Sequence, residues 1–409
     1  MPLINIPVSL SDRAVATPKN KAGEIARSVW VDWLRVTAIF LVVIIHSAEP
    51  FYLGGEGSLI LTESDAFWVS LFDSFARACV PLFIIGSSYL QFPLHYSTKD
   101  FFIRRLKRVL IPFIVWTVVY ALVWGEPVEN FSSLLLNFNY AAGHLWFVYM
   151  LVGIYLLMPI LSPWAEKVKR NELLFYLCVC LFTSFIPFIR EFFSGEGAYI
   201  EGPTGIPAFA KYPLWGECSW NPYGLFYYFS GFIGYLLLGL YLKRFASPKT
   251  GLRSTITALA IWLTGFAVSF GGFLYLVYKT SGSVFPVEGS INLAVLWETP
   301  WAYDSIGVVL MVIGWLLIFR RVSISGNWYK RFILPLAKVS YGVYLCHLLI
   351  LAYVSAHVCE LFGTGQDGIL GFWTTPVEIL LSAIITFVIS SILSYLIGRI
   401  PKLGPYIMG

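Results

Sequence analysis

The chain has 409 residues, of which 58% are hydrophobic and only 12% are charged, and its mean hydropathy is +0.74. Soluble proteins carry roughly 25% charged residues, so this composition excludes an ordinary soluble protein and indicates an all-α, polytopic membrane protein. The net charge of +5 is small and the basic residues are spread over several short loops, so no nucleic-acid partner is indicated.

Ten apolar runs are long enough to cross a hydrocarbon core of ~30 Å as helices. The first run follows 28 residues and lacks a small-residue cleavage site, so we expect an uncleaved first span. The six cysteines fall mostly in apolar stretches, which predicts buried, inert thiols, and the sequence contains no metal-binding or nucleotide-binding motif. The runs lie near residues 29–48, 67–92, 109–124, 143–162, 173–189, 224–242, 256–278, 301–319, 334–357 and 376–398.

The charges of the loops predict an orientation. One set of alternate loops, together with both terminal segments, holds 23 of the 28 Lys and Arg residues, so by the positive-inside rule both termini are predicted to be cytoplasmic. We therefore expect a cytoplasmic N-terminal segment (1–28), one transmembrane domain (29–398) and a cytoplasmic tail (399–409). The long exterior loop 190–223 is rich in glycine, proline and aromatic residues, which predicts an ordered lid over an outward-facing cleft.

The first predicted span carries ionisable residues inside an apolar run. Arg35 and His46 are eleven positions apart, which places both on one helix face, about 16 Å apart along the axis. Asp32 lies one turn before Arg35, where an ion pair can form. Charged groups at this depth cost at least a few kcal/mol unless they face a polar cavity or a partner. This stretch therefore predicts an intramembrane site.

His46 is the candidate general base of that site, because an imidazole can both take and return a proton near neutral pH. Glu49 lies three residues later on the same helix face, where its carboxylate can orient the imidazole and stabilise its charged form. The alternative is a histidine that serves only in helix packing, beside an ordinary interfacial acid.

Five stretches in chain order resemble the acyltransferase-3 family of membrane acyltransferases. The Arg35-x10-His46 spacing resembles the signature of the family's first span, and FFIRRLKRVLIP (101–112) is similar to its Arg-Arg-x-x-Arg motif. Where the family commonly has Ser-Gly before the aromatic residue of the second span, this chain has Ser87-Ser88-Tyr89. The other three resembling stretches are RACVPLFIIGSSYL (77–90), GHLWFVYMLVGIYLLMPIL (143–161) and SYGVYLCHLLIL (340–351).

The resemblance implies an enzyme that moves an acyl group, most commonly acetyl, from cytoplasmic acyl-CoA to a hydroxyl of a carbohydrate or other cell-envelope acceptor. It implies acyl-CoA as a co-substrate with no permanently bound cofactor, and a multi-pass protein of a bacterial inner membrane in contact with its lipids. Arg104, Arg105 and Arg108 would bind the CoA phosphates, because arginine binds phosphate bidentately. Arg35 would lie farther along the path of the pantetheine arm. The alternative for the cluster is charge that only sets topology.

By the same resemblance, four residues of later spans would face the acceptor. His144 and Trp146 would contact it, and Tyr341 and His347 would form a hydrogen-bonding wall. The alternatives are an interfacial aromatic residue for Trp146 and hydrogen bonding between helices for His347.

Other ionisable residues are expected to have no part in the chemistry. His95 and His357 match no motif. Asp73 and Arg77 are four positions apart, which predicts a structural ion pair at the end of the second span. We assign no chemistry to the remaining two intramembrane acids, Asp304 and Glu378.

Two other classes of function are compatible with parts of the sequence. A proton-coupled transporter of an anionic solute would also need buried His, Arg and Asp groups, but the sequence has no matched pair of broken helices and a carrier does not explain the arginine cluster. A scaffold or sensor without catalysis would not need Arg35 and His46 on one helix face. The sequence does not indicate the oligomeric state, the acyl group or the choice between O- and N-acylation.

Overall fold

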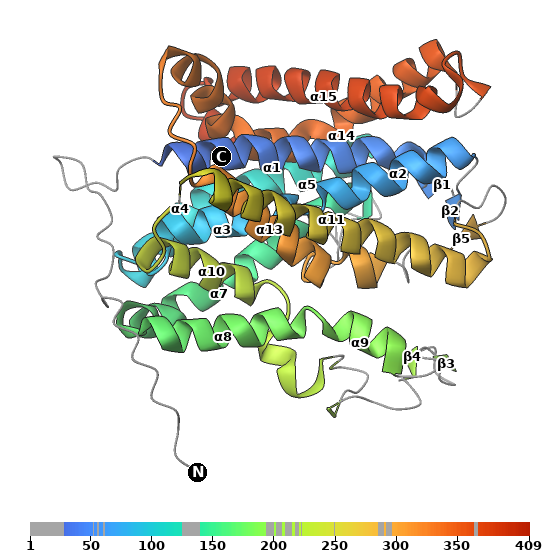
Figure 1. Cartoon of the computed structure of the whole chain (residues 1–409). Coiled ribbons are helices and arrows are strands. Elements are labelled where there is room, and N and C mark those ends of the chain that lie inside the picture. Colours follow the sequence, from blue (N-terminus) through green and yellow to red (C-terminus); the bar gives the residue numbers. More distant parts are fainter. Residues whose placement is uncertain are drawn as a thin grey trace.

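The computed structural model describes residues 28–409 apart from 52, 55–56, 60–61, 125–139, 194–199, 202–206, 209–214, 217–220, 222, 249, 285–289, 292–296 and 364–366. Figure 1 shows a bundle of long helices that run side by side. The α-helices are α1 (Val29–Ala48), α2 (Glu63–Ala76), α3 (Cys79–Gln91), α4 (Thr98–Arg105), α5 (Ile111–Trp124), α7 (Trp146–Lys167), α8 (Arg170–Thr183), α9 (Ile186–Phe193), α10 (Ile233–Arg244), α11 (Leu252–Ser281), α13 (Ile306–Phe319), α14 (Leu334–Phe362), α15 (Thr374–Gly398) and α16 (Gly404–Ile407).

Short helical turns and strands connect these helices. The three-residue and six-residue turns with 3₁₀ geometry are η1 (Glu49–Phe51), η3 (Tyr140–Leu145), η4 (Gly224–Phe229) and η8 (Gly371–Trp373), and the π-helical turns are η2 (Leu106–Leu110), η5 (Trp297–Trp301) and η6 (Tyr329–Ile333). The strands β1 (Leu53–Gly54), β2 (Gly57–Leu59) and β5 (Ser290–Ile291) form one small antiparallel sheet, and β3 (Ile200–Glu201) pairs with β4 (Pro207–Ala208).

Nine helical stretches within the described residues are long and apolar enough to cross a membrane, so the protein is an all-α, polytopic membrane protein as predicted. Several of these stretches join consecutive elements, as Glu63–Gln91 joins α2 and α3. They coincide with nine of the ten predicted runs. The tenth run, 224–242, is not one long helix: η4 ends at Phe229, Gly231 has a φ of +69°, and α10 has 12 residues. A helix of that length spans only about 18 Å. Glycine adopts this left-handed backbone readily, and the helix is interrupted there.

Helix α1 is enclosed by other helices of the bundle. It packs against α2, α3, α14 and α15, and Figure 1 shows α14 and α15 along one side of it. Its buried side chains lie around the whole helix rather than along one stripe, as expected of a helix that is enclosed by others. The ionisable residues of α1 are therefore next to protein rather than to lipid.

Two acidic residues of the spans have defined partners, of which one was predicted. Asp73 and Arg77 form the predicted ion pair, with 2.7 Å between Asp73 Oδ1 and an Arg77 guanidinium nitrogen. Asp32 is buried, and its Oδ2 accepts a hydrogen bond of 2.6 Å from the Tyr329 hydroxyl. This hydrogen bond connects α1 to the π-helical turn η6.

Small residues allow two pairs of helices to approach closely. Ser88 Oγ donates a hydrogen bond of 2.6 Å to the Leu236 carbonyl, and a Cβ at Gly239 would lie 2.5 Å from the Ser88 side chain. Ser88 therefore binds α3 to α10. A Cβ at Gly265 of α11 would lie 2.5 Å from the Met311 nitrogen of α13. Close backbone approach at small residues is a typical basis of helix packing in membranes.

Two predicted segments fall largely outside the described residues. Of the N-terminal segment 1–28, only Ser28 is described, and most of the exterior loop 190–223 is not. The proposed roles of these segments therefore stay predictions.

Candidate active site

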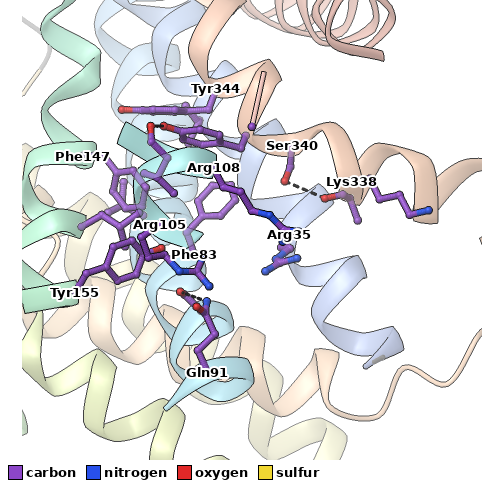
Figure 2. A pocket seen from close by; sticks show the side chains of 18 residues that line it. Arg35, Phe83, Gln91, Arg105, Arg108, Phe147, Tyr155, Lys338, Ser340 and Tyr344 are labelled. Carbon is purple, nitrogen blue, oxygen red and sulfur yellow. Dashed lines mark hydrogen bonds between the residues drawn. The ribbon is translucent and has the colours of Figure 1, made fainter. Parts of the chain in front are cut away.

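Basic side chains from four elements line a cavity of about 320 Å³, here called the arginine cavity. Arg35 reaches it from α1, Arg105 from the end of α4 and Arg108 from η2, and Figure 2 shows the three side chains converging. Lys338 of α14 also lines it, and no Asp or Glu is among its described lining residues. The charged side chains that line this cavity are thus all cations, which attract anions, and guanidinium groups suit phosphate in particular.

A second cavity of about 270 Å³, here called the Tyr96 cavity, adjoins the arginine cavity. The two cavities share Gln91, Arg105 and Arg108 as lining residues. Arg104 lines only the Tyr96 cavity, where its guanidinium carbon lies 4.3 Å from the centre of the Tyr96 ring. The arginine cluster predicted from the sequence is thus spread over two neighbouring cavities.

The π-helical turn η2 separates α4 from α5 and carries Arg108. Such a turn changes the direction in which successive side chains project. Arg105 and Arg108 both line the two cavities, whereas Lys107 between them lines neither. The position of each residue in this turn, and not its charge alone, therefore decides whether it lines the cavities.

A third cavity of about 260 Å³, here called the histidine cavity, contains the predicted base. His46, Glu49, His144 and Trp146 line it, as does Arg77. Its remaining aromatic wall includes Tyr303, whose ring stacks on Trp146 with 5.4 Å between centroids and 28° between planes. The structure thus brings together four of the predicted site residues.

The arginine and histidine cavities are neighbours. Val42, Val80, Phe147 and Tyr344 line both of them. Val42 lies on α1 between Arg35, which lines the first cavity, and His46, which lines the second. The helix face predicted from the sequence therefore borders two adjoining cavities rather than a single one.

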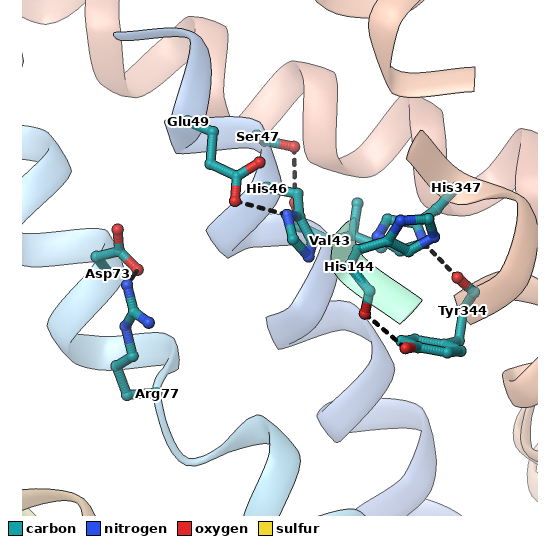
Figure 3. A network of polar contacts seen from close by, with 9 residues as sticks. All are labelled: Val43, His46, Ser47, Glu49, Asp73, Arg77, His144, Tyr344 and His347. Carbon is teal, nitrogen blue, oxygen red and sulfur yellow. Dashed lines mark hydrogen bonds and ion pairs between the residues drawn. The ribbon is translucent and has the colours of Figure 1, made fainter. Parts of the chain in front are cut away.

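His46 and Glu49 lie at the end of α1. His46 Nδ1 is 2.8 Å from Glu49 Oε1, and both side chains are partly exposed, at 16% and 28% (Figure 3). Glu49 directly follows α1 and is the first residue of the 3₁₀ turn η1, so the end of the helix fixes where its carboxylate lies. A proton on Nδ1 facing the carboxylate leaves the lone pair on Nε2, which is the arrangement that a general base needs.

Two further histidines, distant in the chain, pack beside His46. The His46 ring centroid lies 5.1 Å from that of His347 and 6.2 Å from that of His144, and the latter two are 5.2 Å apart. His144 belongs to η3 and His347 to α14, and both are buried. Within the described residues, both ring nitrogens of His144 lack a hydrogen-bond partner.

Tyr344 holds this cluster together. Its hydroxyl donates a hydrogen bond of 2.6 Å to the His144 carbonyl, and its own carbonyl lies 2.8 Å from His347 Nδ1 (Figure 3). A carbonyl only accepts, so His347 carries its proton on Nδ1 and its acceptor nitrogen is Nε2.

Two of the predicted acceptor-side residues lie elsewhere than expected. Tyr341 lines the arginine cavity, where its hydroxyl donates a hydrogen bond of 2.8 Å to the Val109 carbonyl. His347 packs against His46 and His144 but is not among the residues that line the histidine cavity. Both stand on α14 as the sequence motif implies, but the packing of neighbouring helices decides which cavity each borders.

Sequence reasoning missed several lining residues. Arg77 and Tyr303 line the histidine cavity, Lys338 lines the arginine cavity, and His95 lines the Tyr96 cavity. Arg77 stands in one of the resembling stretches, which was a usable signal. Tyr303 and Lys338 lie inside predicted spans and His95 follows one, but none of the three belongs to a motif that marks it as a site residue. Among the described residues, no group of three or more His, Cys, Asp or Glu is placed to hold a metal ion.

The chain matches the family model for the acyltransferase-3 acyltransferase domain over residues 28–395. No curated protein and no solved structure matches it. The family match covers every span that contributes to the three cavities. This multi-pass integral membrane protein therefore belongs to the acyltransferase-3 family of acyltransferases.

Proposed function

We propose that this protein transfers an acyl group, acetyl in the first instance, from cytoplasmic acyl-CoA to a hydroxyl of a carbohydrate or other cell-envelope acceptor. The observation that carries the proposal is the adjacency of a cavity lined by cations and a cavity lined by histidines, with four lining residues in common. A bacterial inner membrane, with both termini in the cytoplasm, would place the arginine and Tyr96 cavities on the side where CoA is available.

The acyl-CoA donor would enter through the arginine and Tyr96 cavities. Arg104, Arg105 and Arg108 supply charge for the CoA phosphates, since arginine forms paired hydrogen bonds with phosphate. Arg35, which lines the arginine cavity from α1, would hold the pantetheine arm. The arm then passes Val42 and its neighbours, so that the thioester reaches the histidine cavity.

The acceptor would occupy the histidine cavity. The stacked rings of Trp146 and Tyr303 provide a flat surface of the kind on which sugars pack. His46 Nε2 takes the proton of the acceptor hydroxyl as its oxygen attacks the thioester carbonyl, and Glu49 stabilises the imidazolium that forms. Loss of the CoA thiolate completes the transfer, and the thiolate recovers that proton from His46. The products are an ester and free CoA.

The test is thioester turnover by the purified protein in nanodiscs. Wild type would release free CoA from acetyl-CoA slowly, and faster when a glycan acceptor is present. His46→Ala would lower kcat about 10²- to 10⁴-fold, the usual contribution of a general base. Arg105→Ala/Arg108→Ala would mainly raise the KM for acetyl-CoA.

His357→Ala is the matched control, because His357 lies on the exposed side of α14 and lines none of the three cavities. It should behave as wild type. If wild type neither binds nor turns over acetyl-CoA or succinyl-CoA, the proposal is wrong. Transport of an anionic solute is then the next hypothesis to test.

A further inference from the structure

Arg77 brings a cation to the histidine cavity from the side of α2. It is the first residue after α2 and lines the same cavity as His46 and Glu49. Its side chain is only 10% exposed, so the charge is held close to the cavity rather than in bulk solvent. Glu49 and Arg77 are the two residues of formal charge among the described lining of this cavity.

The position of the Arg77 guanidinium is fixed from several sides. Its ion pair with Asp73 is 2.7 Å long, and the Asp73 side chain is completely buried (Figure 3). Its guanidinium carbon lies 4.9 Å from the centre of the Trp301 ring and 6.0 Å from that of Tyr303. Trp301 is itself fixed, because its indole N–H donates a hydrogen bond of 2.8 Å to Ser74 Oγ. The cation is therefore rigid before any substrate binds.

A purely structural role explains this arrangement poorly. Burial of an ion pair has a desolvation cost that often exceeds the attraction between the charges, and apolar residues can fill the same space without that cost. Asp73 does not line the cavity whereas Arg77 does. The pair is thus oriented with its positive member toward the space that contains the base.

The chemistry of acyl transfer creates negative charge in the cavity that contains the base. When the acceptor oxygen bonds to the thioester carbon, the electrons of the C=O π bond move to the carbonyl oxygen, which becomes an oxyanion. The Glu49 carboxylate favours the protonated His46 but repels that oxyanion. A preorganised donor on another wall of the cavity offsets this repulsion, and such donors are usually a large contribution to catalysis.

We propose that Arg77 is a catalytic residue that stabilises this oxyanion, and that Asp73 is the positioning residue that holds it. This inference rests on the proposed acyl transfer. In the step itself the C–O bond forms and the hydroxyl proton moves to His46. The oxyanion then collapses to C=O, the C–S bond breaks, and the thiolate takes the proton from His46. Arg77 keeps its protons throughout.

The rival role for Arg77 is recognition of an anionic group on the acceptor. Hydrolysis of acetyl-CoA by water, measured without any acceptor, separates the two roles. Water attack also creates the oxyanion, so an oxyanion-stabilising residue affects hydrolysis and transfer alike. A residue that only binds the acceptor affects transfer alone.

The experiment compares wild type with Arg77→Lys and with the charge-neutral pair Asp73→Asn/Arg77→Gln, which leaves no unpaired buried charge. The neutral pair should lower kcat for acetyl-CoA hydrolysis about 100- to 1,000-fold, as loss of an oxyanion donor does elsewhere, with KM for acetyl-CoA unchanged. Arg77→Lys should keep a larger part of the rate than the neutral pair. Thermal unfolding and CoA binding show whether each variant is folded. If the neutral pair is not folded, the rate of hydrolysis by Arg77→Lys alone decides the outcome.

Arg321→Gln is the matched control, since Arg321 is held by hydrogen bonds to Ser254 and Thr255 and lines none of the three cavities. It should hydrolyse acetyl-CoA as wild type does. Folded Arg77 variants with a wild-type rate of hydrolysis would overturn the proposal. Absence of turnover in wild type would instead overturn the proposed function on which it rests, so the two failures are distinct.

Discussion

His46 Nδ1 lies 2.8 Å from Glu49 Oε1, at the point where α1 gives way to the turn η1. The contact directs one ring nitrogen to a carboxylate and leaves the other for proton transfer. It also resists rotation of the ring, which packs against His144 and His347. Orientation and charge of the imidazole are therefore both coupled to Glu49.

The charge of Glu49 should be necessary for full activity. Glu49→Gln keeps the shape of the side chain but cannot stabilise an imidazolium, so kcat should fall roughly 100-fold or more while KM for acetyl-CoA stays the same. Steady-state release of free CoA measures both constants. Glu360→Gln, at an exposed position of α14, should have no effect. A wild-type kcat for Glu49→Gln would show that the contact serves packing alone.

Arg108 and Lys107 should differ sharply although they are adjacent. Arg108 lines two cavities and Lys107 lines neither. A hydrogen bond to a charged group contributes about 1.5–3 kcal/mol, so Arg108→Gln should weaken acetyl-CoA binding about tenfold or more. Lys107→Gln should change it little. Binding measured at several salt concentrations should also show a weaker salt dependence for Arg108→Gln. Equal effects of the two substitutions would mean that overall charge, not the cavity, attracts the donor.

The shared wall of the arginine and histidine cavities should be a point where the reaction can be blocked. Val80 is 6% exposed and lines both cavities. Val80→Trp should stop turnover of acetyl-CoA. Binding of free CoA, which needs only the arginine and Tyr96 cavities, should be retained. Val388→Trp on the exposed side of α15, where the valine is 48% exposed, is the control. Retained turnover in a folded Val80→Trp protein would show that the donor does not pass this wall.

Two glycines of α11 should respond in opposite directions to alanine. A Cβ at Gly265 would lie 2.5 Å from the Met311 nitrogen and 2.6 Å from the Gly307 oxygen, both backbone atoms, whereas a Cβ at Gly271 meets nothing within 4 Å. Overpacking of this kind typically costs about 1–3 kcal/mol, so Gly265→Ala should lower the free energy of unfolding. Gly271→Ala should raise it by up to about 1 kcal/mol, the difference in helix propensity. Thermal unfolding in detergent measures both, and equal shifts would contradict the close approach of α11 and α13.

Much of the fold was predictable because spans are local features. An apolar run of sufficient length forms a helix in a membrane whatever its neighbours are, and nine of the ten predicted runs coincide with such helices. The exception, 224–242, fails at Gly231, where the backbone turns left-handed. Average hydropathy cannot detect this break, because it depends on one dihedral angle.

Within one helix, the sequence alone also determined which residues share a face. The periodicity of α1 put Arg35 and His46 on one side, and the spacing of Asp73 and Arg77 predicted their ion pair, which is confirmed. Both relationships follow from 3.6 residues per turn. Only the tertiary structure decided what each face meets. It joined His144 and His347 to His46, moved Tyr341 to the arginine cavity, and brought Arg77 to the histidine cavity. Periodicity specifies a direction around a helix axis, whereas the partner found in that direction depends on how distant helices pack.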